Sequence, residues 1–333
     1  ISNSNQILVY NQIFTLACSS YTFSSFPVSF TCAITKNDKL YIGTTKSGLF
    51  ETTIVNPTVF TNISPNGPIE DYAFKVTKTT NDLWLTHGSY DRTYTPDTKL
   101  QGISLYNTNT GWSKIPTTEL QGAVSLAAIT ENPRNLNEVF VASGHSGLLK
   151  FTNKTNSVLY NQTNFLESIA WLPSAVVQSP NYIHYGNIDI DTNSTKWIAT
   201  YGRGVIAFNE KYNNKFIVIN QENGNLPSND VRCVAVDNRN QLWIGTFTGL
   251  RIINSIDRFI TETELTSTNI VIQEGDLAQE LFYQQVIQDI KVDGSNNKWV
   301  AIADAGVFQV SPNGQTTIRR FTKENSPLPS NNV

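Results

Sequence analysis

The feature that most constrains the fold is a short unit that recurs along the chain. Its clearest copy, residues 241–250, reads QLWIGTFTGL. It combines strand-forming residues with a tight loop between Gly245 and Gly249, and strand-forming residues then resume. Another strand-like run, 231–236, precedes it and ends in the polar turn 237–240. Each unit therefore predicts three or more short strands joined by tight turns.

Five further copies of this unit occur, each with one aromatic residue in its second strand. The six aromatic positions are Tyr41, Trp84, Phe140, Trp197, Trp243 and Trp299. Units that contain strands but no helices and repeat every ~40 to 50 residues are typical of β-propeller blades. None of the units shows the 3.6-residue apolar spacing of a helical solenoid. We therefore predict an all-β propeller in which Trp84, Trp197, Trp243 and Trp299 form the core between blades.

The two ends of the sequence suggest one further blade. Residues 6–16 are strand-patterned, but no blade start precedes them, and the final LPSNNV nearly repeats the LPSNDV that opens a blade at 226. We expect a seven-bladed propeller with one blade incomplete or closed by strands from both termini, because such closure avoids free sheet edges. Six blades with irregular ends is the alternative. On this view residues 1–333 form a single propeller domain cut from a longer protein.

Composition excludes several classes of protein. The 333-residue chain has 15% charged residues and a net charge of −3, so it lacks the basic surface of a nucleic-acid-binding protein. It has no apolar run long enough for a transmembrane helix. Cys32 and Cys233 fall on first strands of non-neighbouring blades, where we expect small buried residues. A disulfide between Cys18 and Cys32 is the alternative.

No motif predicts catalysis, and we expect neither an enzyme nor a cofactor or metal. The three histidines are dispersed, and there is no P-loop, dinucleotide-binding or nucleophile-elbow motif. Residues 293–297 resemble the start of a calcium loop but fit better as a hairpin. A glycan-cleaving propeller that gathers carboxylates from distant loops stays open.

Binding is predicted at the loops that follow the second strands, which meet at one mouth of a propeller channel. Aromatic rings with arginine suit sugars, phosphates or a peptide, although a mixed exposed surface would look the same. The candidate residues are His87, Tyr90, Arg92, Tyr94, His145, Tyr201, Arg203 and Phe247. Insertions at 90–101, 161–185 and 261–285 are expected on the surface, with a short helical turn at 276–284.

The unit LWIGT…GL, with NSPLPS at 325–330, resembles the two-component regulator propeller repeat of exported proteins and sensor domains in Bacteroidetes. Residues 281–333, together with 242–251, 83–88 and the insertion 275–281, are similar to the PorZ family of the type IX secretion system.

That resemblance implies an exported, non-catalytic protein at the cell surface, associated with the outer membrane. Its implied partners are PorU-, PorV- and PorQ-like proteins, with which it supports sortase-mediated attachment of secreted cargo to anionic lipopolysaccharide. The repeat alone would also fit the periplasmic ligand-sensing propeller of a hybrid two-component sensor.

Overall fold

The computed structural model describes residues 8–10, 13, 16–18, 29–45, 47–54, 59–89, 96–160, 183–274 and 277–333. The chain divides into two compact units, Ile1–Gly67 and Pro68–Val333, and each is described by itself. Both consist of antiparallel strands, and three short 3-10 helices lie in unit 2, at Thr117–Glu119, Glu210–Tyr212 and Ile256–Ile260. The all-β prediction is confirmed.

Unit 1 is built on one four-stranded sheet and one small strand pair. The sheet contains β3 (Phe30–Lys36), β4 (Lys39–Thr44), β5 (Leu49–Thr53) and β6 (Thr61–Asn62), and the pair is β1 (Val9–Tyr10) with β2 (Leu16–Cys18). Asn37 and Asp38 join β3 to β4 with positive φ angles of 51° and 59°, the conformation that a two-residue hairpin favours. Phe30, Leu40 and Ile42 form the buried core.

The described part of unit 2 contains a succession of antiparallel sheets, most of them four-stranded. The first holds β7 (Lys75–Lys78), β8 (Leu83–Thr86), β9 (Ile103–Asn107) and β10 (Gly111–Ile115). The second holds β11 (Leu126–Glu131), β12 (Glu138–Ser143), β13 (Gly147–Thr152) and β14 (Asn156–Tyr160). The third holds β15 (Ile183–Ile190), β16 (Lys196–Thr200), β17 (Gly204–Asn209) and β18 (Lys215–Ile219).

The fourth sheet has three strands, β19 (Val231–Val236), β20 (Leu242–Thr246) and β21 (Gly249–Ile253). The fifth holds β24 (Ile287–Val292), β25 (Lys298–Ile302), β26 (Gly306–Val310) and β27 (Thr317–Phe321). Between these two sheets lies a hairpin of β22 (Val271–Glu274) and β23 (Leu277–Glu280). The helical turn predicted at 276–284 is therefore wrong, because β23 occupies its first half.

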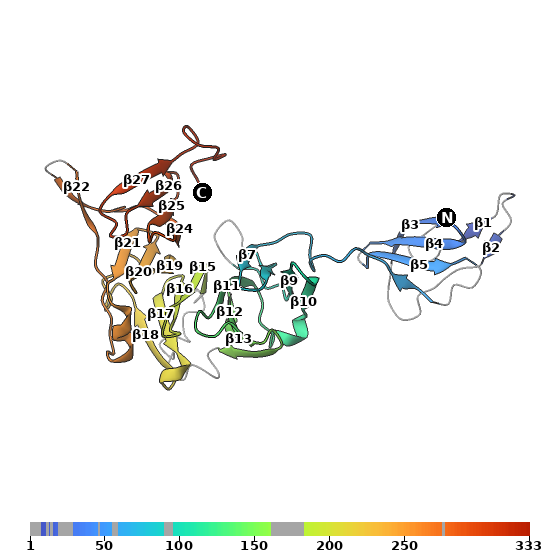
Figure 1. The fold of residues 1–333 in the computed structure, drawn as a ribbon, viewed down its shortest axis with the longest axis horizontal. Coiled ribbons are helices and arrows are strands. Elements are labelled where there is room, and N and C mark those ends of the chain that lie inside the picture. The colour runs from blue at the N-terminus through green and yellow to red at the C-terminus, as the bar shows by residue number, and fades with distance from the viewer. Residues whose placement is uncertain are drawn as a thin grey trace. The chain divides into compact units, whose positions relative to one another are not determined.

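The sheets of unit 2 follow one another around a common centre, with β7, β11, β15, β19 and β24 innermost (Figure 1). Side chains join neighbouring inner strands. Thr130 of β11 donates its hydroxyl to the carbonyl of Ile188 in β15 at 2.5 Å, and the backbone N–H of Val236 in β19 donates to Asp189 of β15 at 2.8 Å. Repeated sheets that meet along their first strands are the defining arrangement of a propeller.

One type of turn shapes three of the five hairpins between first and second strands. Asp191, Asp237 and Asp293 each follow an inner strand and accept two backbone N–H groups of their own turn through Oδ1, at 2.8–3.0 Å. A residue with positive φ completes each turn. The prediction of a hairpin rather than a calcium loop at 293–297 is confirmed.

Three of the four tryptophans predicted as core, Trp84, Trp197 and Trp243, lie between sheets, and so does Phe140. All six fall on the second strand of their sheet, and each of the four from Trp84 to Trp243 belongs to a buried cluster that includes the following sheet. The pairs are Trp84 with Val141, Phe140 with Ile198, Trp197 with Ile244, and Trp243 with Val300. Trp84, Phe140, Trp197 and Trp243 are at most 1% exposed.

The prediction of a core position is wrong for Trp299, which is only half-buried. Its ring stacks on Phe321 at 5.6 Å between centroids, and its Nε1 donates to Asp293 at 3.1 Å.

The two cysteines whose side chains are described differ in exposure. Cys233 is fully buried as predicted, whereas Cys32 is exposed, and both are free thiols. The side chain of Cys18 lies outside the described residues.

The propeller class is therefore established, whereas the number of blades and the single domain over 1–333 stay predictions.

Candidate functional site

Five of the eight binding residues predicted from sequence lie in the described part of the chain. Tyr90, Arg92 and Tyr94 lie outside the described residues. The remaining five lie in or beside the loops that follow second strands: His145 and Phe247 are exposed, Tyr201 and Arg203 are half-buried, and His87 is buried. Their role in binding stays a prediction.

His87 lies inside the first sheet of unit 2 and not on a rim. Its Nδ1 donates to the backbone carbonyl of Tyr72 at 2.5 Å, and its Nε2 lies 2.7 Å from the hydroxyl of Ser104, which donates to it. Ser104 in turn accepts the backbone N–H of Ile69 at 2.8 Å. Since both ring nitrogens are used within the protein, His87 ties residues 69–72 to the sheet.

Around Phe247 the structure reveals two residues that the sequence pattern had not indicated. The Arg232 guanidinium lies 5.3 Å from the centre of the exposed Phe247 ring and donates to Asp230 at 2.7 Å. Arg232 is only 4% exposed. Burial raises the pKa of Asp230, although the bond from Arg232 opposes that change. The sequence signal that could have indicated this pair was an arginine within the otherwise apolar run 231–236.

A second candidate site is a channel between the inner strands. The cavity has a volume of about 500 Å³ and is lined by residues of β7, β11, β15, β19 and β24. Its charged lining residues are Lys75, Lys78, Asp189 and Lys291. First strands line the centre of any propeller, so polar residues in those strands were the sequence signal for this site.

Charges in the channel favour an anion. Burial lowers the pKa of Lys75, and the carboxylate of Asp289 offsets this effect only in part. The Lys75 ammonium is therefore poorly solvated and would gain from a bound anion. The channel is lined by three lysines and one aspartate, and one of the lysines, Lys291, is paired with Asp289 at 3.1 Å. Binding of a phosphate or carboxylate group is the chemistry that this arrangement supports.

Asp189 stands at the channel wall and joins two sheets. Its two carboxylate oxygens accept the backbone N–H groups of Ile190 and Val236, both at 2.8 Å. Burial raises the pKa of Asp189 above its ordinary value of 3.8, more than these two hydrogen bonds lower it. The folded state therefore holds a proton on Asp189 more tightly than the unfolded state does.

This raised pKa predicts a pH dependence of stability. The contribution of Asp189 is fully present below its unfolded pKa of 3.8 and is lost as pH rises through the higher folded pKa. We expect the free energy of unfolding of the wild type, relative to Asp189→Asn, to fall as the pH rises from about 4 through the raised pKa of the folded state. Guanidinium titrations of both proteins across that range measure it. A difference that grew with pH would contradict the assignment.

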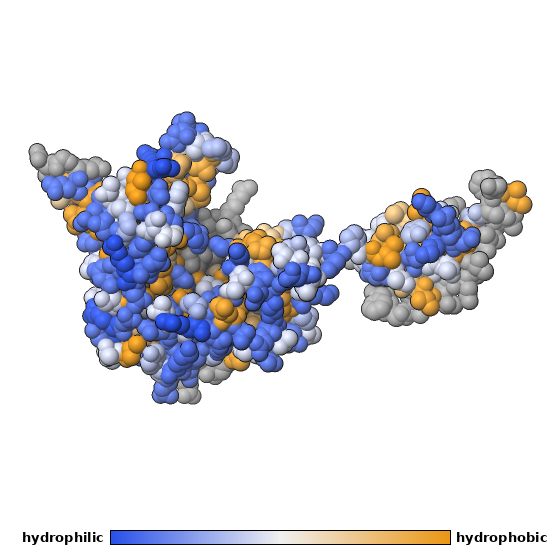
Figure 2. Space-filling model, in the orientation of Figure 1, coloured by the Kyte–Doolittle hydropathy of each residue, from blue (hydrophilic) through white to orange (hydrophobic). Residues whose placement is uncertain are grey.

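The outer surface offers less for binding than the channel does. On the face shown in Figure 2, hydrophilic residues dominate the described surface of unit 2, and apolar residues lie in small groups. Large apolar patches are what mark many protein interaction sites, and small groups are ordinary on a soluble surface. Recognition by polar and charged groups fits this surface better.

One protein-family model matches part of the repeat region. Residues 225–248, which include the clearest unit in the sequence, match the family model "two component regulator propeller". The chain carries a two-component regulator propeller repeat. The match covers Leu242–Thr246 of β20 and the turn at Asp237, so the repeat corresponds to the inner hairpin of the fourth sheet. No curated protein sequence matches the chain.

Solved structures share the propeller fold. PorZ, an essential bacterial surface component of the type IX secretion system of Porphyromonas gingivalis, is similar with 15% identity and a TM-score of 0.51. The match covers 99% of this chain and 52% of PorZ, so the chain spans about half the length of that protein. At this identity the likeness establishes the fold alone.

Two weaker likenesses carry no argument about function. Virginiamycin B lyase from Staphylococcus aureus is 11% identical with a TM-score of 0.44, over 90% of this chain and 85% of the lyase. The extracellular domain of a protein described as a hybrid two component system from B. thetaiotaomicron is 18% identical with a TM-score of 0.33. The match covers 99% of this chain and 44% of that one. In the part of the chain that the structure describes, no helix is both long and apolar enough to cross a membrane.

Proposed function

We propose that the chain is a non-catalytic binding propeller of the type IX secretion system, exported to the cell surface, where it supports sortase-mediated attachment of secreted proteins. The observation that carries the proposal is the likeness of its fold to PorZ over 99% of the chain. The two-component regulator propeller repeat also agrees with an exported binding module. The proposed protein partners are PorU-, PorV- and PorQ-like.

The channel supplies the proposed contact with anionic lipopolysaccharide. Lys78 and Lys291 are exposed in its lining, and Lys75 lies deeper. A phosphate or carboxylate of the polysaccharide would neutralise these ammonium groups, with the strongest gain at the poorly solvated Lys75.

The role in secretion is tested in the organism that encodes the chain. Deletion of the gene should release cargo that is normally attached to the surface, and the tagged protein should co-precipitate PorU- and PorV-like partners. Normal anchoring of cargo in the deletion strain would defeat the proposal. A tagged copy that restores anchoring is the control for effects on neighbouring genes.

The channel contact is tested by charge reversal. We expect Lys78→Glu with Lys291→Glu to weaken co-sedimentation with lipopolysaccharide vesicles about tenfold at low salt, because attraction becomes repulsion over a short distance. Both side chains are exposed, so folding should be little affected. Lys114→Glu, an exposed change on the outer strand β10, is the matched control. Equal binding by both variants would rule out the channel as the contact.

A further inference from the structure

One lysine of the central channel has no partner within the protein. In the described part of the chain, the lysines that are at least partly shielded from solvent are Lys75, Lys150, Lys196, Lys215 and Lys298. Four of them donate to a carboxylate or to a backbone carbonyl of the chain. Lys75 makes neither a hydrogen bond nor an ion pair with any described residue. Among these five, its amine alone is therefore available to a ligand.

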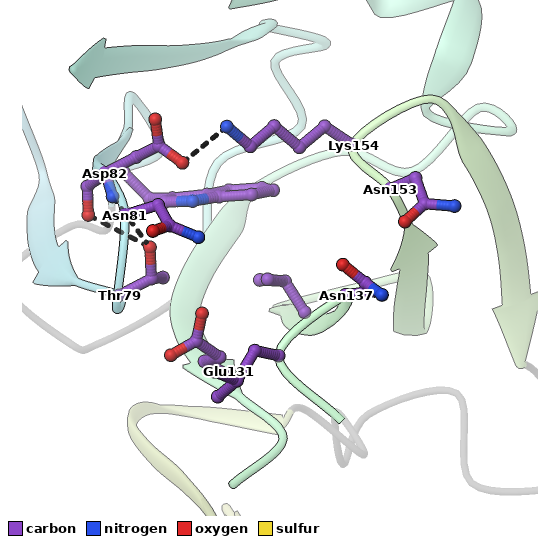
Figure 3. Close-up of a pocket in the computed structure, with 10 residues that line it drawn as sticks. Thr79, Asn81, Asp82, Glu131, Asn137, Asn153 and Lys154 are labelled. Carbon is purple, nitrogen blue, oxygen red and sulfur yellow. Dashed lines mark hydrogen bonds and ion pairs between the residues drawn. The ribbon is translucent and has the colours of Figure 1, made fainter. Parts of the chain in front are cut away.

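The paired lysines show how the fold usually accommodates an ammonium group. Lys298 donates to Asp237 at 2.7 Å, and its Nζ lies 4.5 Å from the centre of the Trp243 ring. Even Lys154, which is exposed and lines a smaller pocket of about 230 Å³, is paired with Asp82 at 2.5 Å (Figure 3). A shielded ammonium without such a partner is destabilised relative to the neutral amine.

Lys75 borders a space that is large enough for a ligand. It lies on β7 and lines the channel, whose volume of about 500 Å³ falls within the roughly 300–1,000 Å³ of small-molecule sites. The residue is half-buried, and its Nζ is not among the unpaired side-chain atoms that are sealed from solvent. A small molecule in the channel can therefore reach the amine.

The surroundings of Lys75 favour the neutral, nucleophilic amine. Burial lowers its pKa below the ordinary value of 10.5, the Asp289 carboxylate offsets part of this change, and the Lys291 ammonium lowers the pKa further. Cys233 makes a smaller contribution that raises it. Asp289 is itself paired with Lys291 at 3.1 Å. Desolvation and a neighbouring cation are the conditions that make a lysine nucleophilic near neutral pH.

The other titratable groups of the channel wall specify the charge of the ligand. Lys78 on β7 and Lys291 on β24 are both exposed in the lining. Asp189 on β15 is held by the backbone N–H groups of Ile190 and Val236, both at 2.8 Å. A phosphate or carboxylate group is therefore favoured beside the two exposed ammonium groups. A nucleophilic amine beside them calls for an electrophilic carbon on the same molecule.

We propose that the channel captures a small aldehyde that carries a phosphate or carboxylate group, and that Lys75 holds it as an imine. The nitrogen lone pair of the neutral amine forms the C–N bond. The carbonyl oxygen takes both amine hydrogens in turn and leaves as water when the C=N bond forms, so the step needs no oxidant or reductant. The inference shares the channel with the proposed lipopolysaccharide contact, but it does not rest on the role in secretion.

Pyridoxal phosphate is the probe, because its imine absorbs visible light and borohydride fixes it for peptide mapping by mass spectrometry. With the full chain near neutral pH, we expect Lys75 to be labelled about tenfold faster than Lys114, which is exposed on β10. Pyridoxal without the phosphate should label Lys75 about tenfold more slowly, and inorganic phosphate should compete with the probe. The labelling of Lys75 should rise with pH with a midpoint below 10.5.

A matched pair of variants completes the test. Lys75→Arg keeps the positive charge but removes the nucleophile, so the imine absorption should be lost, whereas Lys114→Arg should keep it. Circular dichroism checks that both variants are folded. The imine needs the amine and the lipopolysaccharide contact needs only charge, so Lys75→Arg separates failure of this inference from failure of the proposed function. Equal labelling of Lys75 and Lys114, or imine absorption retained in Lys75→Arg, would overturn the proposal.

Discussion

Replacing Lys298 with alanine is expected to lower the free energy of unfolding by about 3–5 kcal/mol, because it leaves the Asp237 carboxylate buried without its partner. The Nζ of Lys298 lies 2.7 Å from Asp237, and both side chains are completely buried. Lys298 also donates to the carbonyls of Asn296 and Pro312, at 2.9 Å and 2.8 Å. The pair links the fourth sheet to the fifth, so its loss should weaken the contact between blades.

A double variant of Asp237 and Lys298 is the control for this loss of stability. Burial alone would raise the pKa of Asp237, but the hydrogen bond from Lys298 and those from its own turn outweigh it and hold the pKa below 3.8. Removing both charges, in Asp237→Asn with Lys298→Met, should recover much of the lost stability, because the amide oxygen can still accept the N–H groups of the turn and no charge is left buried. Guanidinium titration followed by circular dichroism measures all three proteins. A Lys298→Ala protein as stable as the wild type would show that the Asp237 carboxylate does not need Lys298 as its buried partner.

Truncation of Trp197 to alanine is expected to cost about 3–5 kcal/mol of stability, the range for a large aromatic side chain in a core. Trp197 is fully buried and packs in one cluster with Val234 and Leu242 of the following sheet. Its loss would also leave Asp191 without the indole donor at 3.1 Å. Thermal and chemical unfolding of the purified variant give the measurement.

Trp299→Ala separates the effect of packing between sheets from the effect of losing an aromatic ring. Trp299 occupies the same strand position as Trp197, but it is half-buried and stacks on Phe321 of its own sheet. Its truncation should therefore cost clearly less than that of Trp197. Equal losses at the two positions would contradict the account of packing between blades.

Much of this architecture could be predicted because a propeller repeats itself. The same aromatic position returns in every unit, and from Trp84 to Trp243 it packs against the following sheet, so Trp197 and Trp243 were identifiable as core without coordinates. The turn at Asp293 was predictable for the same reason. The Lys298–Asp237 pair was not predicted, because it joins two units, and neither unit alone shows that a lysine before its tryptophan reaches the preceding turn.

The binding residues were harder to predict, because they depend on local departures from the repeat. His87 occupies a loop position in the repeat, but its side chain is buried and hydrogen-bonded to Ser104, which follows the insertion in the sequence. The channel lysines lie on first strands, whereas the binding residues predicted from sequence lie in loops. Among the described residues the Nε1 of Trp84 has no acceptor, because Thr79 stands where the third sheet has Asp191, and only a comparison of the two registers reveals this.

The most direct test of the central claim, that tryptophans pack between successive sheets of a propeller, is ¹⁹F NMR of the whole chain labelled with 5-fluorotryptophan. Signals are assigned by single Trp→Phe variants and compared in H₂O and D₂O. The account predicts that Trp84, Trp197 and Trp243 show no solvent isotope shift and that Trp299 shows an intermediate one. Shifts typical of fully exposed indoles at Trp197 and Trp243 would contradict it.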